Sequence, residues 1–472
     1  MRKKYPIQFE VTIEGLAAEG KALTHIDQKV CFVPFAAPGD VVDLQITNKR
    51  KQFLEAKVIQ YHKLGEIRRK PICEHFGVCG GCKWQHLPYE VQLAHKQQTT
   101  IDHLQRIGHL ELPDITSILG SESEYLYRNK LEYTFSNRRW RTAEEMDAPM
   151  SETNALGFHI PGLFDKVLDI NQCHLQNEPS NAIRLFVRDY AVKHDLSFYD
   201  VKSHEGFLRN LMIRNTTIGD WMVVMVFAYE DNAEINALMS AIQQQFSQIT
   251  SLMYVINEKL NDTIHDLDIQ LFHGKDFITE EMPAFETGQP PLKFRIGPKS
   301  FYQTNSVQAG NLYRIGADCL NLKGDETVYD LYTGAGTIAQ YVAKSVKKVV
   351  GIEYVESAIE DAKINAKLNN IENTAFFAGD MVDVLNDGFV KEHGKPDVII
   401  TDPPRAGMHP KVVEQILTIN PNKILYISCN SATQARDLAL LKEAYRITHV
   451  QAVDMFPQTH HVENVVCLEK RA

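Results

Sequence analysis

Cys429 is the residue whose place in the sequence points most directly to covalent chemistry. It follows an apolar run at residues 423–427 and precedes a stretch with helical character, so we expect it at the end of a strand, just before a helix begins. The positive end of a helix dipole favours the thiolate, which is the nucleophilic form of cysteine. A lone cysteine is more often a buried, inert side chain. The nucleophile is the better interpretation here because Cys429 falls in line with other strand ends that carry polar groups.

Glu463 is the candidate partner of Cys429. It lies in the segment 459–464, between two strand-like runs at residues 449–455 and 465–469. In a closing hairpin its carboxylate could return beside Cys429 and act as a general base. On these residues alone an exposed loop acid is the stronger interpretation, so the general base is a hypothesis.

The elements that must position these groups alternate between strands and helices from residue 297 onward. Five short apolar runs have the composition of strands that are buried on both faces: residues 327–331, 348–353, 375–378, 397–400 and 423–427. With helical stretches between them, they predict an α/β domain built on a doubly wound parallel sheet. We place this domain at residues 296–472.

Acidic residues and glycines mark the first three of these strand ends. The first strand contains Asp330 and leads into a turn in which Gly334 and Gly336 let the backbone approach a ligand closely. Glu353 ends the second strand, where a carboxylate can bind ribose hydroxyls, and Asp380 follows the third, where it could hold the amine of adenine. Each acid alone is better explained as a strand-end cap, and the glycine spacing also fits a loose dinucleotide fingerprint. Three acids at successive strand ends favour a nucleoside cofactor.

The fourth strand leads into the sequence Asp402-Pro403-Pro404-Arg405. The two prolines fix their φ angles and predict a rigid edge over the site. Many amine methyltransferases have Asn at the first position of this motif, where its amide holds the target amine. Asp402 therefore fits better with a nucleotide-directed reaction at carbon.

Four cysteines have the spacing of metal or cluster ligands. Cys73, Cys79 and Cys82 lie close together among glycines, and Cys173 lies far downstream. Close thiols with glycines between them suit a metal or an iron–sulfur cluster, and zinc would be satisfied equally well by four thiolates. The wider separation of the first two cysteines argues against radical adenosylmethionine chemistry. The remaining cysteines without a motif, which we expect to be ordinary buried thiols, are Cys31, Cys319 and Cys467.

The N-terminal residues 1–62 alternate short apolar runs with Gly and Pro, which predicts a small OB-like β-barrel of four or five strands. Residues 45–70 carry eight Lys and Arg against two Glu. This basic stretch is either a solvated surface or a set of phosphate contacts, and beside a barrel it favours RNA binding.

Residues 63–295 are predicted to form a mixed α+β central domain. A helix is expected at residues 88–106, where apolar residues fall on one face. The expected strands lie at residues 130–135, 208–214, 221–229 and 251–257. The polar segment at residues 141–154 predicts an excursion from the domain.

Composition sets the broad class of the protein. The chain has 472 residues, enough for about three domains, and its 44% hydrophobic and 23% charged residues are those of a globular protein. The net charge of −10 is not the global signature of a nucleic-acid binder. No apolar run is long enough to cross a membrane and the amino terminus carries no secretory signal, so we expect a cytoplasmic protein without membrane contact. Nothing in the sequence points to an obligate protein partner.

Five motifs, in this order, resemble those of the RNA (uracil-5-)-methyltransferase family, which makes 5-methyluridine with S-adenosylmethionine. The motifs are Phe301-x-Gln303-x-Asn305, Asp330-x-x-x-Gly334-x-Gly336, Asp402-Pro403-Pro404-Arg405, Ser428-Cys429-Asn430 and His461-Val462-Glu463. The resemblance implies that Cys429 adds to C6 of uracil as the nucleophile and that Glu463 removes the C5 proton as the base. The residues that it implies as S-adenosylmethionine contacts are Gln303, Tyr332, Gly334, Gly336, Thr337, Glu353, Asp380 and Asp402. Thr337 departs from the large-subunit rRNA enzymes, which carry Asn after the second glycine.

The rest of the chain resembles the large-subunit rRNA branch of that family. By this resemblance the barrel is a TRAM domain, the C-terminal domain is a class I (Rossmann-like) methyltransferase domain, and the four cysteines hold a [4Fe-4S] cluster. Part of the region 88–120 is also expected to pack on the C-terminal domain. The architecture implies 23S rRNA rather than tRNA as the substrate, because the tRNA branch looks shorter and lacks barrel and cluster.

Other functions stay open at this point. A tRNA 5-methyluridine methyltransferase is the closest alternative. A non-catalytic rRNA-binding or assembly protein would be expected to lack Cys429 or Glu463, and both are present. A 5-methylcytidine enzyme would be expected to show Thr-Cys and Pro-Cys motifs, whereas Arg405 follows the two prolines here.

Overall fold

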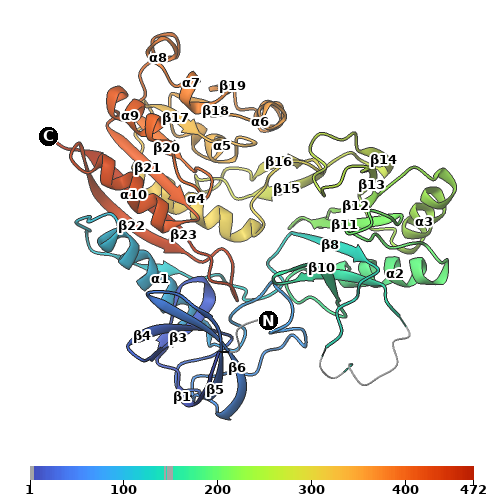
Figure 1. Ribbon diagram of the computed structural model, residues 1–472. Coiled ribbons are helices and arrows are strands. Elements are labelled where there is room, and N and C mark those ends of the chain that lie inside the picture. The colour runs from blue at the N-terminus through green and yellow to red at the C-terminus, as the bar shows by residue number, and fades with distance from the viewer. Residues whose placement is uncertain (1–4, 143–144, 146–151) are drawn as a thin grey trace.

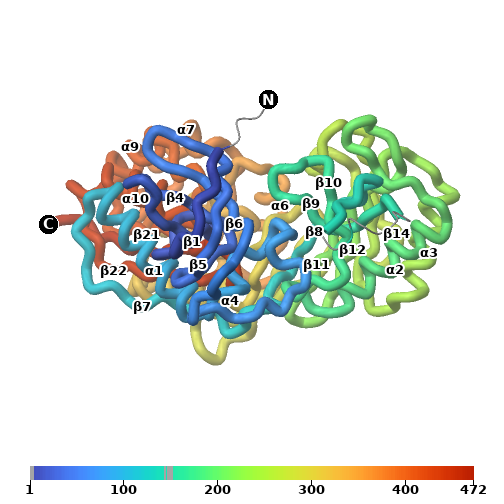
Figure 2. Tube along the Cα trace, turned by 60° about the horizontal axis from the view of Figure 1, so that its bottom comes forward, coloured from blue at the N-terminus to red at the C-terminus, as the bar shows by residue number. Residues whose placement is uncertain are grey.

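The computed structural model describes residues 5–142, 145 and 152–472, which form three parts (Figure 1). A barrel (blue) lies below the C-terminal domain (orange and red), and the central domain (green) lies to one side of both. Seen after a turn about the horizontal axis, the barrel lies against the C-terminal domain and the central domain forms the other end of the molecule (Figure 2). The polar excursion predicted at residues 141–154 falls mostly outside the described residues. Within the described part of the chain, no helix combines the length and apolarity needed to cross a membrane.

The barrel is a single six-stranded sheet with the strand order β1-β5-β6-β4-β3-β2. Its strands are β1 (Ile7–Thr12), β2 (Gly15–Leu16), β3 (Lys21–Ile26), β4 (Lys29–Pro34), β5 (Val41–Lys49) and β6 (Phe53–Lys63), with a 3-10 turn at Ala18–Gly20. Burial alternates along β3, where Ala22, Thr24 and Ile26 are buried, as expected for a strand with one face toward a core. The predicted barrel is confirmed, with one strand more than expected because β2 is too short to show an alternating pattern.

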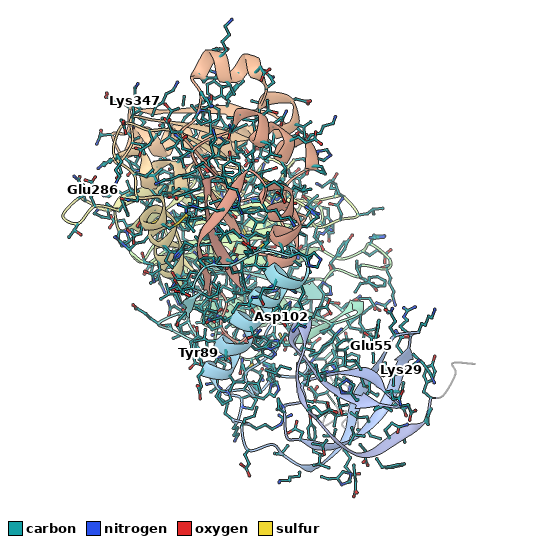
Figure 3. The ribbon with its side chains drawn as sticks, turned by 90° about the vertical axis from the view of Figure 1, so that its left-hand side faces the viewer. Lys29, Glu55, Tyr89, Asp102, Glu286 and Lys347 are labelled. Carbon is teal, nitrogen blue, oxygen red and sulfur yellow. A yellow bond between two sulfur atoms is a disulfide. The ribbon has the colours of Figure 1, made fainter. Side chains whose placement is uncertain are left out.

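A helix and a strand that follow the barrel pack with the C-terminal domain. Helix α1 (Tyr89–Arg106) contacts α10 (Ser431–Leu441), and β7 (Thr116–Leu119) pairs in parallel with β22 (Tyr445–Val453). Figure 3 shows α1, marked by Tyr89 and Asp102, between the barrel and the C-terminal domain. The contact of the region 88–120 with the C-terminal domain, which the resemblance implies, is present.

The central domain is built on a seven-stranded sheet with the order β10-β9-β8-β11-β12-β13-β14. The strands are β8 (Lys130–Ser136), β9 (Ala155–Ile160), β10 (Leu163–Asp169), β11 (Leu208–Asn215), β12 (Trp221–Phe227), β13 (Ser251–Ile256) and β14 (Gln270–Gly274). Helices α2 (Ser180–Lys193) and α3 (Asn232–Gln245) pack on one face. The other face packs toward the C-terminal core and the hairpin of β15 (Ile278–Met282) and β16 (Leu292–Ile296), so every residue of β12 is buried.

The C-terminal domain has an eight-stranded sheet with the order β19-β18-β17-β20-β21-β23-β22-β7. Its parallel strands are β17 (Thr327–Leu331), β18 (Lys348–Glu353), β19 (Thr374–Ala378), β20 (Val398–Thr401) and β21 (Lys423–Ser428), and β23 (Glu463–Lys470) is antiparallel to β21. One face is covered by α4 (Ser306–Leu320), α5 (Thr337–Ala343) and α6 (Glu356–Leu368), and the other by α7 (Met381–Val384), α8 (Asp387–His393), α9 (Pro410–Ile419) and α10. Because both faces are covered, the parallel strands β17, β20 and β21 are almost wholly buried. The predicted doubly wound α/β sheet is confirmed.

Two cysteines behave differently from the prediction. The sequence predicts ordinary buried thiols at Cys319 and Cys467, and this is wrong, because the two form a disulfide. Cys319 lies on α4 and Cys467 on β23, and these elements pack against each other although the two residues are 148 positions apart. Their pairing depends on how α4 crosses the sheet, which spacing along the chain does not reveal. Cys31 is a buried free thiol in the barrel, as predicted.

Candidate active site

The candidate nucleophile and base meet where β21 and β23 pair. Ser428, the last residue of β21, is the register partner of Asn464, and continuing the antiparallel register by one residue sets Cys429 opposite Glu463. The Glu463 carboxylate is close enough to the Cys429 thiol to raise its pKa. The strand-end loop and the closing hairpin, which the sequence predicts separately, thus converge on one place.

Side chains of α10 hold this pairing in register. The Gln434 side-chain amide donates to the carbonyls of Tyr426 on β21 (2.9 Å) and Asn464 on β23 (3.2 Å). Asn464 donates in return to the Gln434 Oε1 atom (2.7 Å). Asn430 caps α10 by accepting from the Ala432 N–H, and its side-chain amide donates to a carbonyl of the Pro-Pro-Arg segment. One helix therefore fixes both strands that carry the candidate catalytic groups.

Burial is the largest influence on the pKa of the Cys429 thiol. The thiol is half-buried, and burial with the nearby carboxylates of Glu463 and Asp402 raises its pKa to about 11, while the Arg405 guanidinium opposes this shift. Burial and then the two acids in the same pocket thus disfavour the thiolate, and the expectation that the helix dipole favours it stays a prediction.

The two acids are themselves shifted. Burial and the neighbouring Asp402 carboxyl raise the pKa of Glu463 to about 8. Burial and the charge of Asp330 raise the pKa of Asp402 to about 7. Two carboxyls that lie close together in a buried site disfavour each other's ionisation, so one tends to keep a proton near neutral pH. A buried carboxyl with a raised pKa suits a general base, because it holds an abstracted proton well.

The turn after β17 has the backbone of a ligand-binding loop. Tyr332, Gly334 and Gly336 have φ angles of 62°, 54° and 73°, in the left-handed region that favours glycine. Apart from Gly334 and its two chain neighbours, no described residue has an atom within 4 Å of the position that a Cβ of Gly334 would occupy, so a ligand can approach the backbone there. The Gly334 N–H donates to Glu353 (3.1 Å), whose other oxygen accepts from the Val355 N–H (3.0 Å). Glu353 thus joins the loop to the end of β18.

Asp330 lies beneath this loop with one oxygen available. Its Oδ2 atom accepts from the Thr333 hydroxyl and from the Ala339 N–H (3.1 Å). Nothing in the described part of the chain donates to its Oδ1 atom, although the residue is buried. Burial raises the pKa of this carboxyl to about 7. An unpaired buried oxygen at this place suits a ligand that brings its own donor.

The other predicted cofactor residues lie around the same sheet edge. Tyr332 is half-buried, and burial together with the nearby Asp380 and Glu353 carboxylates raises its pKa to about 12. Asp380 is exposed and caps α7 by accepting from the Val382 N–H (2.9 Å). Gln303 lies in the loop before α4, where its carbonyl accepts from the Asn129 side chain (2.9 Å). Of the predicted contacts, Glu353 and Asp380 thus lie close enough to Tyr332 for their carboxylates to raise its pKa.

Tyr313 is a residue of the site that the sequence does not reveal. It lies on α4, and its hydroxyl is 3.4 Å from the hydroxyl of Thr337, the first residue of α5. Burial raises its pKa, and the carboxylates of Asp402, Asp330 and Glu463 raise it further, so it lies near all three. In the sequence it is one apolar residue in a helical pattern, and only the packing of α4 against the sheet shows its place.

A cleft leads to Cys429 from the barrel side. It has a volume of about 300 Å³ and is lined by α1, by the barrel edge around Glu19 and by the strand-end loops. Its basic and histidine side chains are His95, Lys96, His103, Arg405, His460 and His461. Burial lowers the pKa of His461 to about 4, so this ring is neutral at physiological pH. The cleft is large enough for a flat base, and residues of the barrel edge form part of its wall.

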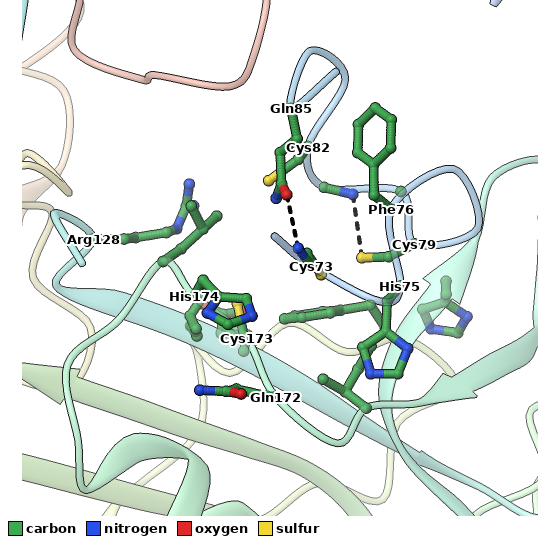
Figure 4. Close-up of a pocket in the computed structure, with 18 of the residues that line it drawn as sticks. Cys73, His75, Phe76, Cys79, Cys82, Gln85, Arg128, Gln172, Cys173 and His174 are labelled. Atoms are coloured by element: carbon green, nitrogen blue, oxygen red, sulfur yellow. Dashed lines mark hydrogen bonds between the residues drawn. The ribbon is translucent and has the colours of Figure 1, made fainter. Parts of the chain in front are cut away.

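The predicted metal cysteines line a separate cavity of about 640 Å³ between the barrel-proximal loop and the central sheet. Figure 4 shows Cys73, Cys79 and Cys82 entering from one loop and Cys173 from the opposite segment. Burial raises the pKa of Cys82 to about 12, and the other three thiols add to the shift, so all four influence one another. In the part of the chain that the structure describes, no group of three or more His, Cys, Asp or Glu is placed to hold a single metal ion.

The basic stretch at residues 45–70 divides into two groups. Arg68 donates to the buried Asp40 (2.7 Å) and Arg69 pairs with Glu124 (2.6 Å), so these two arginines hold the chain after the barrel in place. The exposed members are Lys49, Arg50, Lys51, Lys57, Lys63 and Lys70. These six side chains are accessible in solution to a negatively charged partner.

Two parts of the chain match known protein families. Residues 216–471, more than half of the chain, match the family model described as tRNA (Uracil-5-)-methyltransferase. The chain belongs to the RNA uracil-5-methyltransferase family. Residues 8–59 match the TRAM domain, which agrees with the barrel. The protein is therefore an S-adenosylmethionine-dependent RNA methyltransferase, and RNA is its substrate class.

Relatives match over the full length of the chain. An uncharacterized RNA methyltransferase of Bacteroides thetaiotaomicron is 54% identical over 97% of this chain and 100% of its own. An uncharacterized RNA methyltransferase of Chlorobaculum tepidum is 40% identical over 98% of this chain and 96% of its own. These matches span the barrel, the central domain and the C-terminal domain, so the three parts belong together in members of the family.

A solved structure matches the same arrangement. The tRNA (uracil-54, C5)-methyltransferase of Pyrococcus abyssi, in complex with S-adenosyl-L-homocysteine, is 28% identical and has a TM-score of 0.75, covering 98% of this chain and 100% of its own. This confirms the predicted fold class. Because that protein is named as a tRNA enzyme and spans the whole chain, the three-part architecture does not separate an rRNA enzyme from a tRNA enzyme.

Proposed function

We propose that this protein methylates C5 of a uridine in 23S rRNA through a covalent adduct at Cys429, giving 5-methyluridine. The observation that carries the proposal is the pairing of β21 and β23, which sets Cys429 opposite Glu463 beside Asp402 and the glycine loop. This arrangement gives a nucleophile, a base and a ligand-binding loop at one edge of a sheet.

The chemistry explains why both a thiol and a carboxylate are needed. C5 of uracil is a weak carbon nucleophile, and addition of the Cys429 sulfur at C6 converts the ring to an enolate with electron density at C5. S-adenosylmethionine, when bound, supplies an electrophilic methyl group. After methyl transfer C5 carries both the methyl group and its original hydrogen. Glu463 removes this proton, the C5–C6 double bond forms, and the Cys429 thiolate leaves.

The proton that the Cys429 thiol carries before it attacks C6 must also have an acceptor. The Cys429 thiol is protonated at neutral pH because its pKa is about 11, and Asp402, with a pKa of about 7, is partly ionised there. We infer that Asp402 accepts the thiol proton as sulfur attacks C6, while Arg405 stabilises the developing negative charge. Glu463 then needs to be ionised only at the later step, when it removes the proton from C5.

The residues of the loop fit a nucleoside cofactor with a charged amino-acid end. The open space at Gly334 admits a ligand against the backbone, and the unpaired Asp330 oxygen suits a ligand donor. Glu353 and Asp380 are proposed to bind hydroxyl and amine donors of the nucleoside. The residues proposed to complete the S-adenosylmethionine site are Gln303, Tyr332, Gly336, Thr337 and Asp402. The hydroxyl of Thr337 would replace the amide of the Asn found in the large-subunit rRNA enzymes.

The substrate RNA has two candidates. Large-subunit rRNA is supported by the resemblance of the four-cysteine motif to the rRNA branch of the family. tRNA is the second candidate, because the Pyrococcus abyssi protein of the same architecture is a tRNA (uracil-54, C5)-methyltransferase. An unpaired loop is the expected target in either RNA, since a base there is extruded at lowest cost.

One experiment tests the reaction and the substrate together. Unmodified large-subunit rRNA and unmodified tRNA, each labelled with tritium at uracil C5, are incubated with S-adenosylmethionine and with wild-type protein or the Cys429→Ala variant. We expect tritium release from rRNA by the wild type alone. Release from tRNA alone would identify tRNA as the substrate. No release from either RNA, by protein that binds S-adenosylmethionine, would contradict C5 methylation.

We further propose a [4Fe-4S] cluster in the four-thiol cavity, with zinc as the alternative. The proposal is supported by the resemblance of the cysteine spacing to the large-subunit rRNA branch of the family and by the four thiols that line one cavity. With four protein ligands the cluster has no open site, so its expected role is structural or to position the RNA.

A further inference from the structure

The loop between β22 and β23, residues 454–462, ends directly at Glu463 and is held from several directions. The Asn305 side chain donates to the Met455 carbonyl (3.0 Å), and the Tyr127 hydroxyl donates to the Pro457 carbonyl (3.0 Å). The Lys96 ammonium on α1 donates to the Phe456 carbonyl (3.2 Å). These contacts come from parts of the chain that are distant in sequence, so the loop is shaped by tertiary contacts.

Gln458 connects the loop to other parts of the chain through hydrogen bonds of its backbone and its side chain. It is fully buried and its φ angle is 67°, a left-handed conformation that residues other than glycine seldom adopt. Its N–H donates to Gln92 Oε1 (3.0 Å), and the Gln92 side-chain amide donates back to Gln458 Oε1 (3.1 Å). Its own side-chain amide donates to Glu124 (2.8 Å). Every polar group of its side chain thus has a partner.

The carbonyl of Gln458 joins the loop to residues 73–84, the cysteine-rich segment that contains Cys73, Cys79 and Cys82. It accepts from the N–H groups of Lys83 (2.7 Å) and Trp84 (3.1 Å), the two residues that follow Cys82. Glu124, the partner of the Gln458 amide, is also the partner of Arg69. Gln458 is therefore the point at which α1, the cysteine-rich segment and the chain after the barrel meet the loop that leads to Glu463.

A fully paired buried network of this kind specifies one conformation, because an altered loop would leave several buried groups without partners. The residues between Gln458 and Glu463 include His460 and His461, which line the cleft beside Cys429. A change in the path of this short segment would move the start of β23, where Glu463 lies. Small displacements of a catalytic group cost much rate even when the fold is retained.

We propose that Gln458 is a positioning residue that orients the Glu463 carboxylate toward C5 of the methylated adduct by fixing residues 459–462 to the cysteine-rich segment and α1. The proposal rests on the proposed function, since it concerns the step in which Glu463 removes the C5 proton. It assigns Gln458 to that step and not to the addition of Cys429 or to methyl transfer.

The test separates the two steps in single turnovers. Gln458→Met keeps the approximate volume and removes the amide, and the RNA is the substrate identified in the tritium assay. Methyl transfer is followed with labelled S-adenosylmethionine into free RNA and adduct together, and proton removal is followed by tritium release from C5. We expect proton removal to slow by about tenfold to a hundredfold while methyl transfer changes by much less, so that covalent adduct accumulates.

Two controls distinguish positioning from reduced stability and from failure of the mechanism. Asn257→Leu removes another fully buried amide, one that donates to the Asn261 carbonyl (2.9 Å) in the central domain, and is expected to leave the ratio of the two steps unchanged. Glu463→Gln is expected to trap the adduct. If Glu463→Gln traps the adduct and Gln458→Met slows both steps equally or neither, the role of Gln458 is overturned. If Glu463→Gln traps none and the wild type releases no tritium, the proposed function itself fails.

Discussion

Cys429 and Glu463 face each other across the end of an antiparallel strand pair, one residue beyond the register partners Ser428 and Asn464. The thiol and the carboxylate come from chain segments with helix α10 and strand β22 between them. Their relation is fixed by backbone pairing and by the Gln434 side chain, which bonds to both strands. A strand pair gives a more rigid separation than two loops would, and this suits two groups that act in sequence on neighbouring carbons of one ring.

Replacing Glu463 by Gln should stop the reaction after methyl transfer. The amide keeps the shape of the side chain but cannot accept the C5 proton, so the Cys429 sulfur remains bonded to C6. We expect a band of protein joined to RNA on a denaturing gel, with labelled methyl groups in it. The double variant with Cys429→Ala should form no such band. Turnover by Glu463→Gln within a few-fold of wild type would exclude Glu463 as the base.

The charges around Cys429 should shift its reactivity in opposite directions. Arg405 lowers the pKa of the thiol and Glu463 raises it, around a value of about 11. Arg405→Gln should therefore move the pH midpoint of Cys429 alkylation upward, and Glu463→Gln should move it downward. Each pKa unit changes the thiolate fraction below the midpoint about tenfold. The check is the alkylation rate of the Cys429 peptide by mass spectrometry from pH 7 upward, and shifts of the same sign in both variants would contradict this electrostatic account.

The buried Asp330 should make stability depend on pH. Its folded pKa is raised to about 7, above its unfolded value, so the folded state binds this proton more tightly. The stabilising contribution is present below the unfolded pKa and is lost as the pH rises through about 7. Asp330→Asn removes the dependence, and its amide can keep the bond from Ala339. Relative to wild type, the variant should gain more unfolding free energy at pH 8 than at pH 5, by at most about 3 kcal/mol. Urea denaturation at both pH values measures this, and an equal difference at the two would count against the shift.

The strand framework of the C-terminal domain could be predicted from the sequence because its signal is local. β17 and β18 coincide with the apolar runs at residues 327–331 and 348–353, since strands buried on both faces need apolar residues throughout. The same logic places Cys429 at a strand end. The strand β2 could not be predicted, because its two residues are too few to show an alternating pattern of apolar and polar side chains.

Features that depend on packing between distant elements could not be predicted. Tyr313 faces the acids of the site because α4 crosses the sheet there, and the same crossing brings Cys319 to Cys467. The helix that follows Cys429 leads to the expectation of a favoured thiolate. Burial, and after it the carboxylates of Glu463 and Asp402 from two other strand ends, raise the pKa of this thiol. The local sequence predicts the helix that follows Cys429, but it does not predict that Glu463 and Asp402 lie beside the thiol.

The four-thiol cavity should lose its metal when one cysteine is replaced. Cys173→Ser removes the thiol contributed by the central domain, and a cluster with three protein ligands is expected to be labile in air. The matched control is Cys31→Ser, which changes a free thiol buried in the barrel core. Iron, sulfide and zinc are measured on protein that is purified without oxygen and then exposed to air for a fixed time. We expect iron and sulfide in the wild type and in Cys31→Ser but not in Cys173→Ser, and stoichiometric zinc in their place would establish the alternative.

The exposed lysines of the barrel should contribute to RNA affinity by neutralising phosphates. Lys51 and Lys57 are exposed, unlike Arg68, which is engaged with the buried Asp40. Replacing both by Glu should weaken RNA binding and reduce the slope of log affinity against log salt by about 0.7 to 0.9 for each phosphate that is no longer neutralised. Lys363→Glu changes an exposed lysine on α6 and serves as the control. Affinities are measured by fluorescence anisotropy at several salt concentrations, with S-adenosylmethionine binding expected to be unchanged. An unaltered slope in the double variant would mean that these lysines form a solvated surface, and the RNA-binding face of the barrel would then have to lie elsewhere.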